Sequence, residues 1–250
     1  ETLIKNILKA KRNIKTDDFY KNAHFLNLLK FSIRRRLSGE PISQIVGFKD
    51  FWNSKFYINE NVLDPRPETE LIVEKVLEIS KENLSILDLG TGSGCLAISI
   101  ALERPNFEIF ASDISNDALT IAKFNSKTHK TAVTFIKSDW FSDIDRSFDV
   151  IISNPPYVSE MEYNKLPLGI RRFEPKIALH AGYKGLDCFK KIIKEFFYYL
   201  KPDGLLIMEI GYNQKKSIKD LFHFYGFKKI EIFKDLSKKY RIVCVKKDAI

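Results

Sequence analysis

The stretch Ser85-Ile86-Leu87-Asp88-Leu89-Gly90-Thr91-Gly92-Ser93-Gly94 decides the fold of this chain. A short apolar run leads directly into a glycine-rich turn, and a helical pattern over residues 94–103 follows at once. This order predicts a buried strand, a tight turn and a helix, which is the arrangement where an open parallel sheet binds its ligand. The sequence therefore predicts a doubly wound α/β domain with a ligand site at this turn.

Short apolar runs alternate with helical segments along the rest of the chain after residue 84, which is typical of a Rossmann-like parallel sheet. The predicted strands are Ser85–Leu89, Glu108–Ser112, Val133–Lys137, Asp149–Ser153, Gly204–Ile210, Phe227–Phe233 and Arg241–Val245. The predicted helices between them are Gly94–Glu103, Asp117–Asn125, Leu186–Leu200 and Gln214–Tyr225. We therefore expect an α/β fold with seven strands.

The segment before this sheet has a different pattern. Apolar residues recur at helical spacing over Leu3–Leu8 and again over Phe25–Leu37, and aromatic and polar residues alternate over Phe48–Asn59. The sequence thus divides into a helical domain at 1–47, a β-hairpin linker at 48–62 and the α/β domain at 63–250. At the start of the last part, Thr69 or Glu68 is expected to cap a helix.

Composition limits the class of protein. The chain has 250 residues, 44% of them hydrophobic and 29% charged, which is ordinary for a folded soluble protein. No apolar run is long enough to span a bilayer, no signal-peptide pattern is present, and three cysteines without ligand spacing predict neither a disulfide framework nor a metal site. We expect a cytoplasmic protein that contacts no membrane. The net charge of +9 indicates either a phosphate-rich partner or biased coding, and both interpretations stay open.

The glycine turn predicts a cofactor site. Glycines let the backbone approach a ligand closely, and Asp88 supplies a carboxylate for the ammonium of a methionine moiety. A dinucleotide motif would need glycine where Cys95 stands, so the form Gly-x-Gly-x-Gly preceded by an acid favours S-adenosylmethionine. We assign the following residues to the cofactor: Asp88, Gly90, Thr91, Gly92, Ser93 and Gly94.

Two further acids and a tryptophan follow the next strands. Asp113 ends the second strand, about 20 residues past the glycines, where a carboxylate accepts hydrogen bonds from ribose hydroxyls. Asp139 and Trp140 follow the third strand, where an acid can receive the adenine amine and an aromatic ring can pack on the base. These residues complete the predicted cofactor site, and the strand pattern then suits the methyltransferase variant of the fold, whose final strand can insert antiparallel.

Asn154-Pro155-Pro156-Tyr157 follows the fourth predicted strand and therefore lies beside the cofactor crevice. Two prolines fix the backbone and remove two N–H donors, which leaves an acceptor-rich loop. Asn154 Oδ1 and the Pro155 carbonyl can each accept one N–H of a planar NH₂ group, while Tyr157 packs beside it. The catalytic residues predicted are Asn154, Pro155 and Tyr157; Pro156 joins them in substrate binding, and Asn154 also contacts the cofactor.

The motifs taken together resemble those of the HemK-type peptide chain release factor glutamine methyltransferases. They are Asp64–Glu70, Asp88–Cys95, Asp113–Ser115, Asn154–Tyr157, Phe173–Pro175, Gly185–Asp187 and Glu209–Gly211. The resemblance implies methylation of N5 of the glutamine in the Gly-Gly-Gln motif of peptide chain release factors, with S-adenosyl-L-methionine as donor and a small helical domain that grips the protein substrate. Asp64 departs from the family, which typically has an apolar residue there.

Two alternatives accompany this hypothesis. An adenine-N6 methyltransferase acting on DNA or RNA uses the same kind of acceptor loop, but the short helical segment leaves little room for a target-recognition domain. Direct nucleic-acid binding is therefore not expected, and the chain is expected to be a monomer. A non-catalytic platform protein is the second alternative, and the intact cofactor and acceptor motifs argue against it.

Overall fold

The computed structural model describes residues 23–247, and the predicted helix at residues 3–8 lies outside them. Its centre is a seven-stranded sheet of order β5-β4-β3-β6-β7-β9-β8, in which only β9 runs antiparallel to its neighbours. This confirms the predicted α/β class and the antiparallel last strand. The strands are β3 (Ser85–Leu89), β4 (Glu108–Asp113), β5 (Val133–Lys137), β6 (Phe148–Ser153), β7 (Leu200–Glu209), β8 (Ile230–Lys234) and β9 (Tyr240–Lys246).

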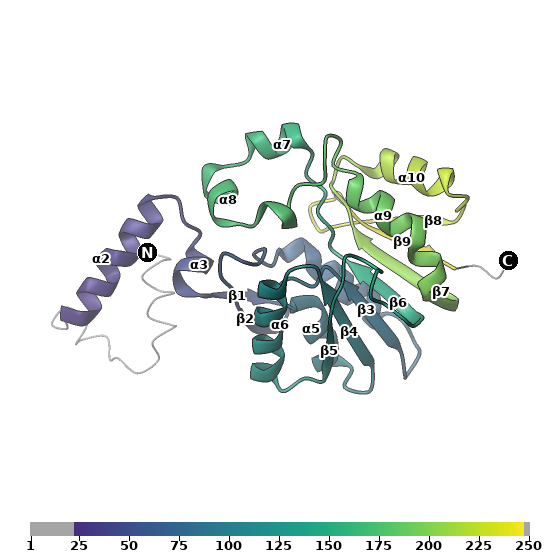
Figure 1. Ribbon diagram of the computed structural model, residues 1–250, viewed down its shortest axis with the longest axis horizontal. Coiled ribbons are helices and arrows are strands. Elements are labelled where there is room, and N and C mark those ends of the chain that lie inside the picture. Colours follow the sequence, from purple (N-terminus) through teal and green to yellow (C-terminus); the bar gives the residue numbers. More distant parts are fainter. Residues whose placement is uncertain (1–22, 248–250) are drawn as a thin grey trace.

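Helices cover both faces of the sheet (Figure 1). Neighbouring residues of one strand enter different cores: Ile86 packs with α4 and α5, whereas Leu87 packs with α9 and α10. Because both faces of β3 are covered, all five of its residues are buried, which explains the apolar run. The helices around the sheet are α4 (Glu70–Leu77), α5 (Cys95–Glu103), α6 (Asn116–His129), α9 (Asp187–Glu195) with η4 (Phe196–Tyr199), and α10 (Lys215–Phe224).

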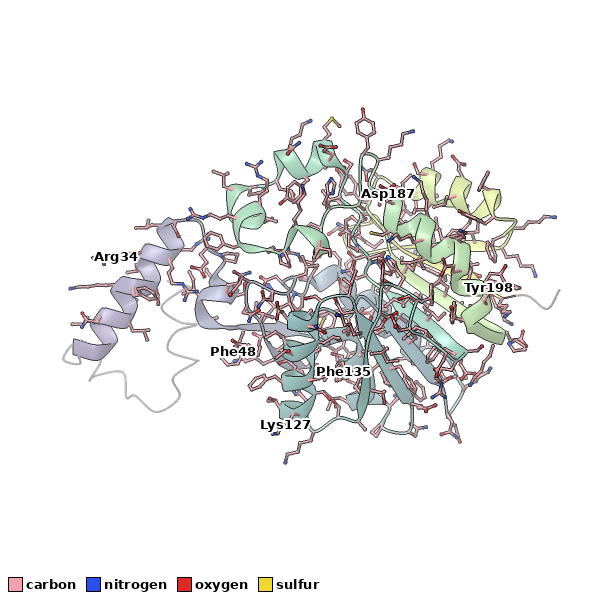
Figure 2. The ribbon with its side chains drawn as sticks, in the orientation of Figure 1. Arg34, Phe48, Lys127, Phe135, Asp187 and Tyr198 are labelled. Atoms are coloured by element: carbon pink, nitrogen blue, oxygen red, sulfur yellow. The ribbon has the colours of Figure 1, made fainter. Side chains whose placement is uncertain are left out.

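The segment before the sheet forms two helices and a hairpin. The helices are α2 (Ala23–Leu37) and α3 (Ile42–Val46), and the hairpin pairs β1 (Phe48–Phe51) with β2 (Ser54–Tyr57). The helix predicted over residues 25–37 is thus confirmed as α2. It lies apart from the sheet (Figure 1), and Figure 2 places Arg34 of α2 and Tyr198 of η4 at opposite ends of the molecule.

One asparagine joins the end of the hairpin to both α6 and the glycine turn. Asn125 of α6 accepts a hydrogen bond from the Tyr57 N–H at 2.8 Å and donates through Nδ2 to the Tyr57 carbonyl at 3.0 Å. The same Nδ2 donates to the Ser93 carbonyl at 2.8 Å. Asn125 therefore ties the hairpin to the glycine turn as well as to α6.

β6 and β9 begin one residue before their predicted positions, at Phe148 and Tyr240, and two strands differ by more. β7 begins at Leu200 rather than Gly204, because Leu200 pairs with Phe148 before the register shifts and pairing resumes at Leu205. β8 begins at Ile230 rather than Phe227, because the Phe227 ring packs against Phe196 and Phe222 at centroid distances of 4.9 and 5.9 Å. In both places contacts between distant segments set the limits of the strand, and the periodicity of the sequence does not show such contacts.

Sequence periodicity also missed the segment between β6 and α9. It contains α7 (Glu160–Lys165), α8 (Leu168–Phe173) and η3 (Lys176–Ala178), which lie above the sheet in Figure 1. Helix α7 begins with a capping box, in which the side chain of Ser159 accepts from the Glu162 N–H and Glu162 accepts from the Ser159 N–H. The pattern Ser-x-x-Glu is visible in the sequence and is the signal that predicts this helix.

Gly94 offers a test of how tightly the turn packs on α6. Its φ is +82°, and a Cβ there would lie 2.9 Å from Ile98 Cδ1 and 3.2 Å from Ala122 Cβ. Gly226 has a φ of +90° but no atom within 4 Å of its Cβ position. We expect Gly226→Ala to lower the free energy of unfolding by about 1–2 kcal/mol through backbone strain alone. Gly94→Ala should lose the same amount and about 1–3 kcal/mol more, because its Cβ overpacks the turn against Ile98 and Ala122. Urea denaturation measures both variants, and equal losses of stability would contradict the close packing at Gly94.

Candidate active site

Four loops meet at the carboxyl ends of β3, β4, β5 and β6. The chain runs outward from β3 to β4 and β5, and then returns to place β6 on the other side of β3. The loops after β3 and β6 therefore diverge and leave a crevice between them. The Ser153 hydroxyl donates to the Leu89 carbonyl at 2.7 Å and holds the two strand ends together below this crevice.

The glycine turn after β3 is held from below and from the side. The N–H groups of Gly90 and Thr91 both donate to the Ser112 carbonyl at 2.9 Å. The Thr91 hydroxyl donates to Asp88 Oδ2 at 2.6 Å. Asp88 is fully buried, and within residues 23–247 its Oδ1 has no hydrogen-bond partner. The carboxylate thus lies under the turn, and its predicted contact with a ligand ammonium stays a prediction.

Asp113 joins the turn to the end of β4. Its Oδ2 accepts from the Gly92 N–H and its Oδ1 from the Ser115 N–H, both at 2.9 Å. Burial raises the pKa of the Asp113 carboxyl, and these backbone N–H groups oppose that rise. A carboxylate has about four lone-pair sites, so two remain available to donors such as ribose hydroxyls.

The loop after β5 brings Trp140 next to the glycines. Trp140 has a φ of +55°, and its carbonyl accepts from the Ser138 hydroxyl at 2.8 Å, which fixes this unusual backbone. A Cβ at Gly90 would lie 3.9 Å from Trp140 Cζ3, so the indole stands directly over the turn. Asp139 is paired with Lys191 of α9 at 3.5 Å.

These loops enclose a cavity of about 250 Å³. Seven of the predicted site residues line it: Gly90, Gly92, Asp113, Asp139, Trp140, Asn154 and Pro156. The other lining residues come from the turn at 61–63 after the hairpin, the loops after β4 and β5, α6, the segment after α8, and α9. Four predicted residues lie in the body of the turn and outside the lining: Asp88, Thr91, Ser93 and Gly94. Pro155 and Tyr157 do not line this cavity either.

A second, smaller cavity of about 40 Å³ is lined in part by the acceptor loop. Its lining consists of Leu63, Arg66, Asn154, Pro155, Tyr157, Val158, Ala178 and Leu179. Asn154 lines both cavities, together with Leu63 and Ala178, and therefore lies where the two adjoin. Within residues 23–247, neither Asn154 Oδ1 nor the Pro155 carbonyl accepts a hydrogen bond. The two acceptors that the sequence predicts are therefore free at the point where the cavities meet.

Sequence reasoning missed a group of residues behind the acceptor loop. Thr69 was expected as a possible helix cap, but its side chain makes no capping bond and donates instead to Glu209 Oε2 at 2.5 Å. Arg66 binds both carboxylate oxygens of Glu174 at 2.8 and 2.6 Å. The motifs around these residues are visible in the sequence, but the contacts join positions more than one hundred residues apart. Only the fold shows the pairing.

The Tyr157 hydroxyl points away from the acceptors. It donates to Glu209 Oε1 at 3.0 Å, and burial, together with the charge of Glu209, raises the pKa of the phenol well above its usual value. Tyr157 consequently stays protonated at neutral pH and cannot act as a base. Its ring instead packs against the core beside β7.

Among the described residues 23–247, no group of His, Cys, Asp and Glu could hold a metal ion, and no helix is long and apolar enough to cross a membrane.

The chain was compared with known proteins. Residues 61–167 match the family model of the methyltransferase small domain. A release factor glutamine methyltransferase of Lactococcus lactis is 40% identical over 88% of this chain and 83% of its own length. One from Buchnera aphidicola of Acyrthosiphon pisum is 39% identical over 99% of this chain and 90% of its own. A bifunctional methyltransferase of Rickettsia prowazekii is 39% identical over 84% of this chain, which spans only 45% of that protein.

Solved structures share the fold at low identity. A methyltransferase from Pyrococcus furiosus has a TM-score of 0.59 at 18% identity, over 87% of this chain and 98% of that one. A T. thermophilus 16S rRNA methyltransferase in complex with S-adenosylmethionine and guanosine has a TM-score of 0.57 at 16% identity. The match covers 80% of this chain and 49% of that one.

Fold and comparisons together define a methyltransferase built on a Rossmann-like sheet. Within that class, the chain belongs to the release factor glutamine methyltransferase family.

The buried Asp88 predicts a pH dependence of stability. Burial raises the pKa of its carboxyl from 3.8 to about 7, against the hydrogen bond from the Thr91 hydroxyl. A group whose pKa is raised in the folded state contributes stability at pH values below its pKa in the unfolded chain. This contribution is lost as the pH rises through its pKa in the folded state. Asp88→Asn does not titrate, so we expect its stability relative to the parent to increase between pH 5 and pH 8 in urea unfolding.

Asp149→Asn is the matched control. Burial raises the pKa of Asp149, but hydrogen bonds from Lys201 and Ser85 outweigh it and lower the value to about 2. Asp149 is therefore ionised in both states across this pH range, and its variant should differ from the parent by a constant amount. If the difference in stability between Asp88→Asn and the parent were also independent of pH, folding would not raise the pKa of Asp88 and the prediction would be wrong.

Proposed function

We propose that the chain transfers a methyl group from S-adenosyl-L-methionine to N5 of the glutamine in the Gly-Gly-Gln motif of peptide chain release factors. The observation that carries this proposal is the position of Asn154 at the junction of the two cavities. The larger cavity suits the methyl donor, and the smaller one suits a narrow side chain that reaches the junction from the other side.

The larger cavity fits the donor at three points. Trp140 lines this cavity beside Gly90 and Gly92, so its ring is available to pack against the adenine base. Asp113 keeps two lone-pair sites for ribose hydroxyls after accepting from Gly92 and Ser115. We propose that Asp139 accepts from the adenine amine, because its carboxylate keeps lone pairs for this donor beside the ion pair with Lys191. When bound, S-adenosylmethionine supplies an electrophilic methyl group.

The acceptor loop meets the chemical demand of an amide. An amide nitrogen is a poor nucleophile because its lone pair is delocalised, so it must be held in place and its developing positive charge must be stabilised. Asn154 Oδ1 and the Pro155 carbonyl supply two acceptors for its two N–H groups. The proton can leave once the nitrogen is methylated and acidic, which needs no strong base. This agrees with the protonated state of Tyr157.

We propose that residues 1–47 form a separate substrate-binding domain, joined to the α/β domain at 63–250 through the hairpin region at 48–62. Support comes from α2, which lies apart from the sheet (Figure 1) and exposes Phe31, Ile33 and Leu37. Such apolar side chains on a projecting helix suit contact with a protein. Three arginines, Arg34, Arg35 and Arg36, end the same helix.

The substrate can be identified with labelled donor. We expect the purified chain to methylate a bacterial-type release factor and to leave its Gln→Ala variant in the Gly-Gly-Gln motif unlabelled. DNA and RNA containing unmethylated adenine are the competing substrates, because the same acceptor logic serves an adenine amine. Label found only in nucleic acid would refute the proposal.

Asn154→Ala tests the acceptor role. Removal of one positioned acceptor should lower kcat by about 100-fold or more. Affinity for the donor should stay within about tenfold in calorimetry, because most donor contacts are elsewhere. Asn53→Ala, on the hairpin turn and away from both cavities, is the matched control and should keep full turnover. Normal turnover by the Asn154 variant would show that another group holds the acceptor.

A further inference from the structure

Three hydrogen bonds connect the end of β7 to the acceptor loop. Glu209 Oε2 accepts from the Thr69 hydroxyl at 2.5 Å, and Glu209 Oε1 accepts from the Tyr157 hydroxyl at 3.0 Å. The Thr69 oxygen in turn accepts from Asn154 Nδ2 at 3.1 Å. Glu209 therefore reaches two residues of the acceptor loop, Tyr157 directly and Asn154 through Thr69.

The chemistry of the donors fixes the direction of this chain of bonds. An ionised carboxylate only accepts, and a threonine hydroxyl has one hydrogen to give. The Thr69 hydrogen is directed to Glu209, so its lone pairs are left for the amide of Asn154. Only Nδ2 of that amide can donate, and Oδ1 must then face the other way. A reversed amide would place two acceptor oxygens against each other.

Burial makes the arrangement hard to replace by water. Glu209 is 1% exposed and Thr69 is 2% exposed. Burial raises the pKa of Glu209, while the hydrogen bonds from Thr69 and Tyr157 and the charge of Arg241 lower it and Glu68 raises it. The pKa of Glu209 is raised overall by burial, and the two hydroxyl donors and the nearby guanidinium oppose that rise because they favour the carboxylate form.

We propose that Glu209 and Thr69 are positioning residues that fix the amide of Asn154 with Oδ1 toward the acceptor nitrogen. The inference rests on the proposed function and deepens it, because it explains how an asparagine with two nearly isosteric ends presents only its oxygen. The same carboxylate holds the Tyr157 ring, so one buried acid sets both the acceptor oxygen and the flat surface beside it.

Thr69→Val keeps the shape of the side chain and removes the hydroxyl. Asn154 then loses the partner of its Nδ2, and the amide can turn so that an N–H faces the N–H groups of the acceptor. We expect kcat at saturating substrates to fall by about 10- to 100-fold, the usual effect of removing an outer partner of a functional group. Donor affinity in calorimetry should stay within about twofold.

Two further variants separate positioning from general stability. Thr69→Ser restores the hydroxyl and should recover kcat to within about threefold of the parent. Ser85→Ala removes a hydroxyl that donates to the Asp149 carboxylate at 2.7 Å, near the opposite end of β3, and should leave kcat unchanged. If Ser85→Ala and Thr69→Val lower kcat equally, loss of a buried hydroxyl explains the effect and the positioning role is wrong.

The double variant with Glu209→Gln tests the chain of bonds itself. A glutamine cannot accept from both hydroxyls, so the single variant should also lose kcat. Since both changes break one series, the double variant should lose no more than about threefold beyond the worse single variant. If the kcat losses of the two single variants multiplied fully in the double variant, Thr69 and Glu209 would act independently and the proposed series of hydrogen bonds would be wrong.

Nuclear magnetic resonance gives a readout that does not depend on turnover. The side-chain amide pair of Asn154 in ¹⁵N-labelled protein is assigned by its loss in Asn154→Ala. We expect Thr69→Val to shift this pair and to accelerate its hydrogen exchange, and Thr69→Ser to restore both. An unchanged pair in Thr69→Val would overturn the inference. If the amide responds as expected but no release factor is methylated, the proposed function fails and the positioning inference stands.

Discussion

The parallel pairing of β3 with β6 is the constraint on which the site depends. It brings the carboxyl end of a strand that leads to the glycine turn beside the end of one that leads to the acceptor loop. Residues 86–89 pair in register with 150–153, and the Ser153 hydroxyl fixes the last step to Leu89. The two loops separate at this point because the chain leaves β3 in one direction and returns from the other.

Two buried carboxylates support the two loops in a similar way. Asp88 accepts from the Thr91 hydroxyl below the glycine turn, and Glu209 accepts from the Thr69 hydroxyl behind the acceptor loop. Each acid is essentially inaccessible to water, and burial raises the pKa of each. Isolated buried charges are costly, so hydrogen-bond donors must be supplied by the fold. Loops held in this manner are stiff, which suits the precise placement of two substrates.

Sequence reasoning succeeded where a signal is local. The strand β5 was predicted at its observed limits, and β3 likewise, because their apolar runs end at clear turns. It failed between residues 158 and 180, where α7 and α8 are too short to show a period. It also offered Thr69 or Glu68 as the helix cap, which is the local interpretation, whereas the Thr69 hydroxyl donates to a residue 140 positions away.

The sequence by itself determined the seven strands of the sheet, the long helices between them, the glycine turn, the proline-fixed acceptor loop and, through resemblance, the family. These are local patterns, since each depends on the spacing of residues within one short segment. Only the tertiary structure decided that Asn154 lines both cavities, that Asp88 lies under the turn instead of in the lining, and that Glu209 faces Thr69 and Tyr157. Such contacts join segments that meet only after the sheet has formed, so no spacing along the chain encodes them.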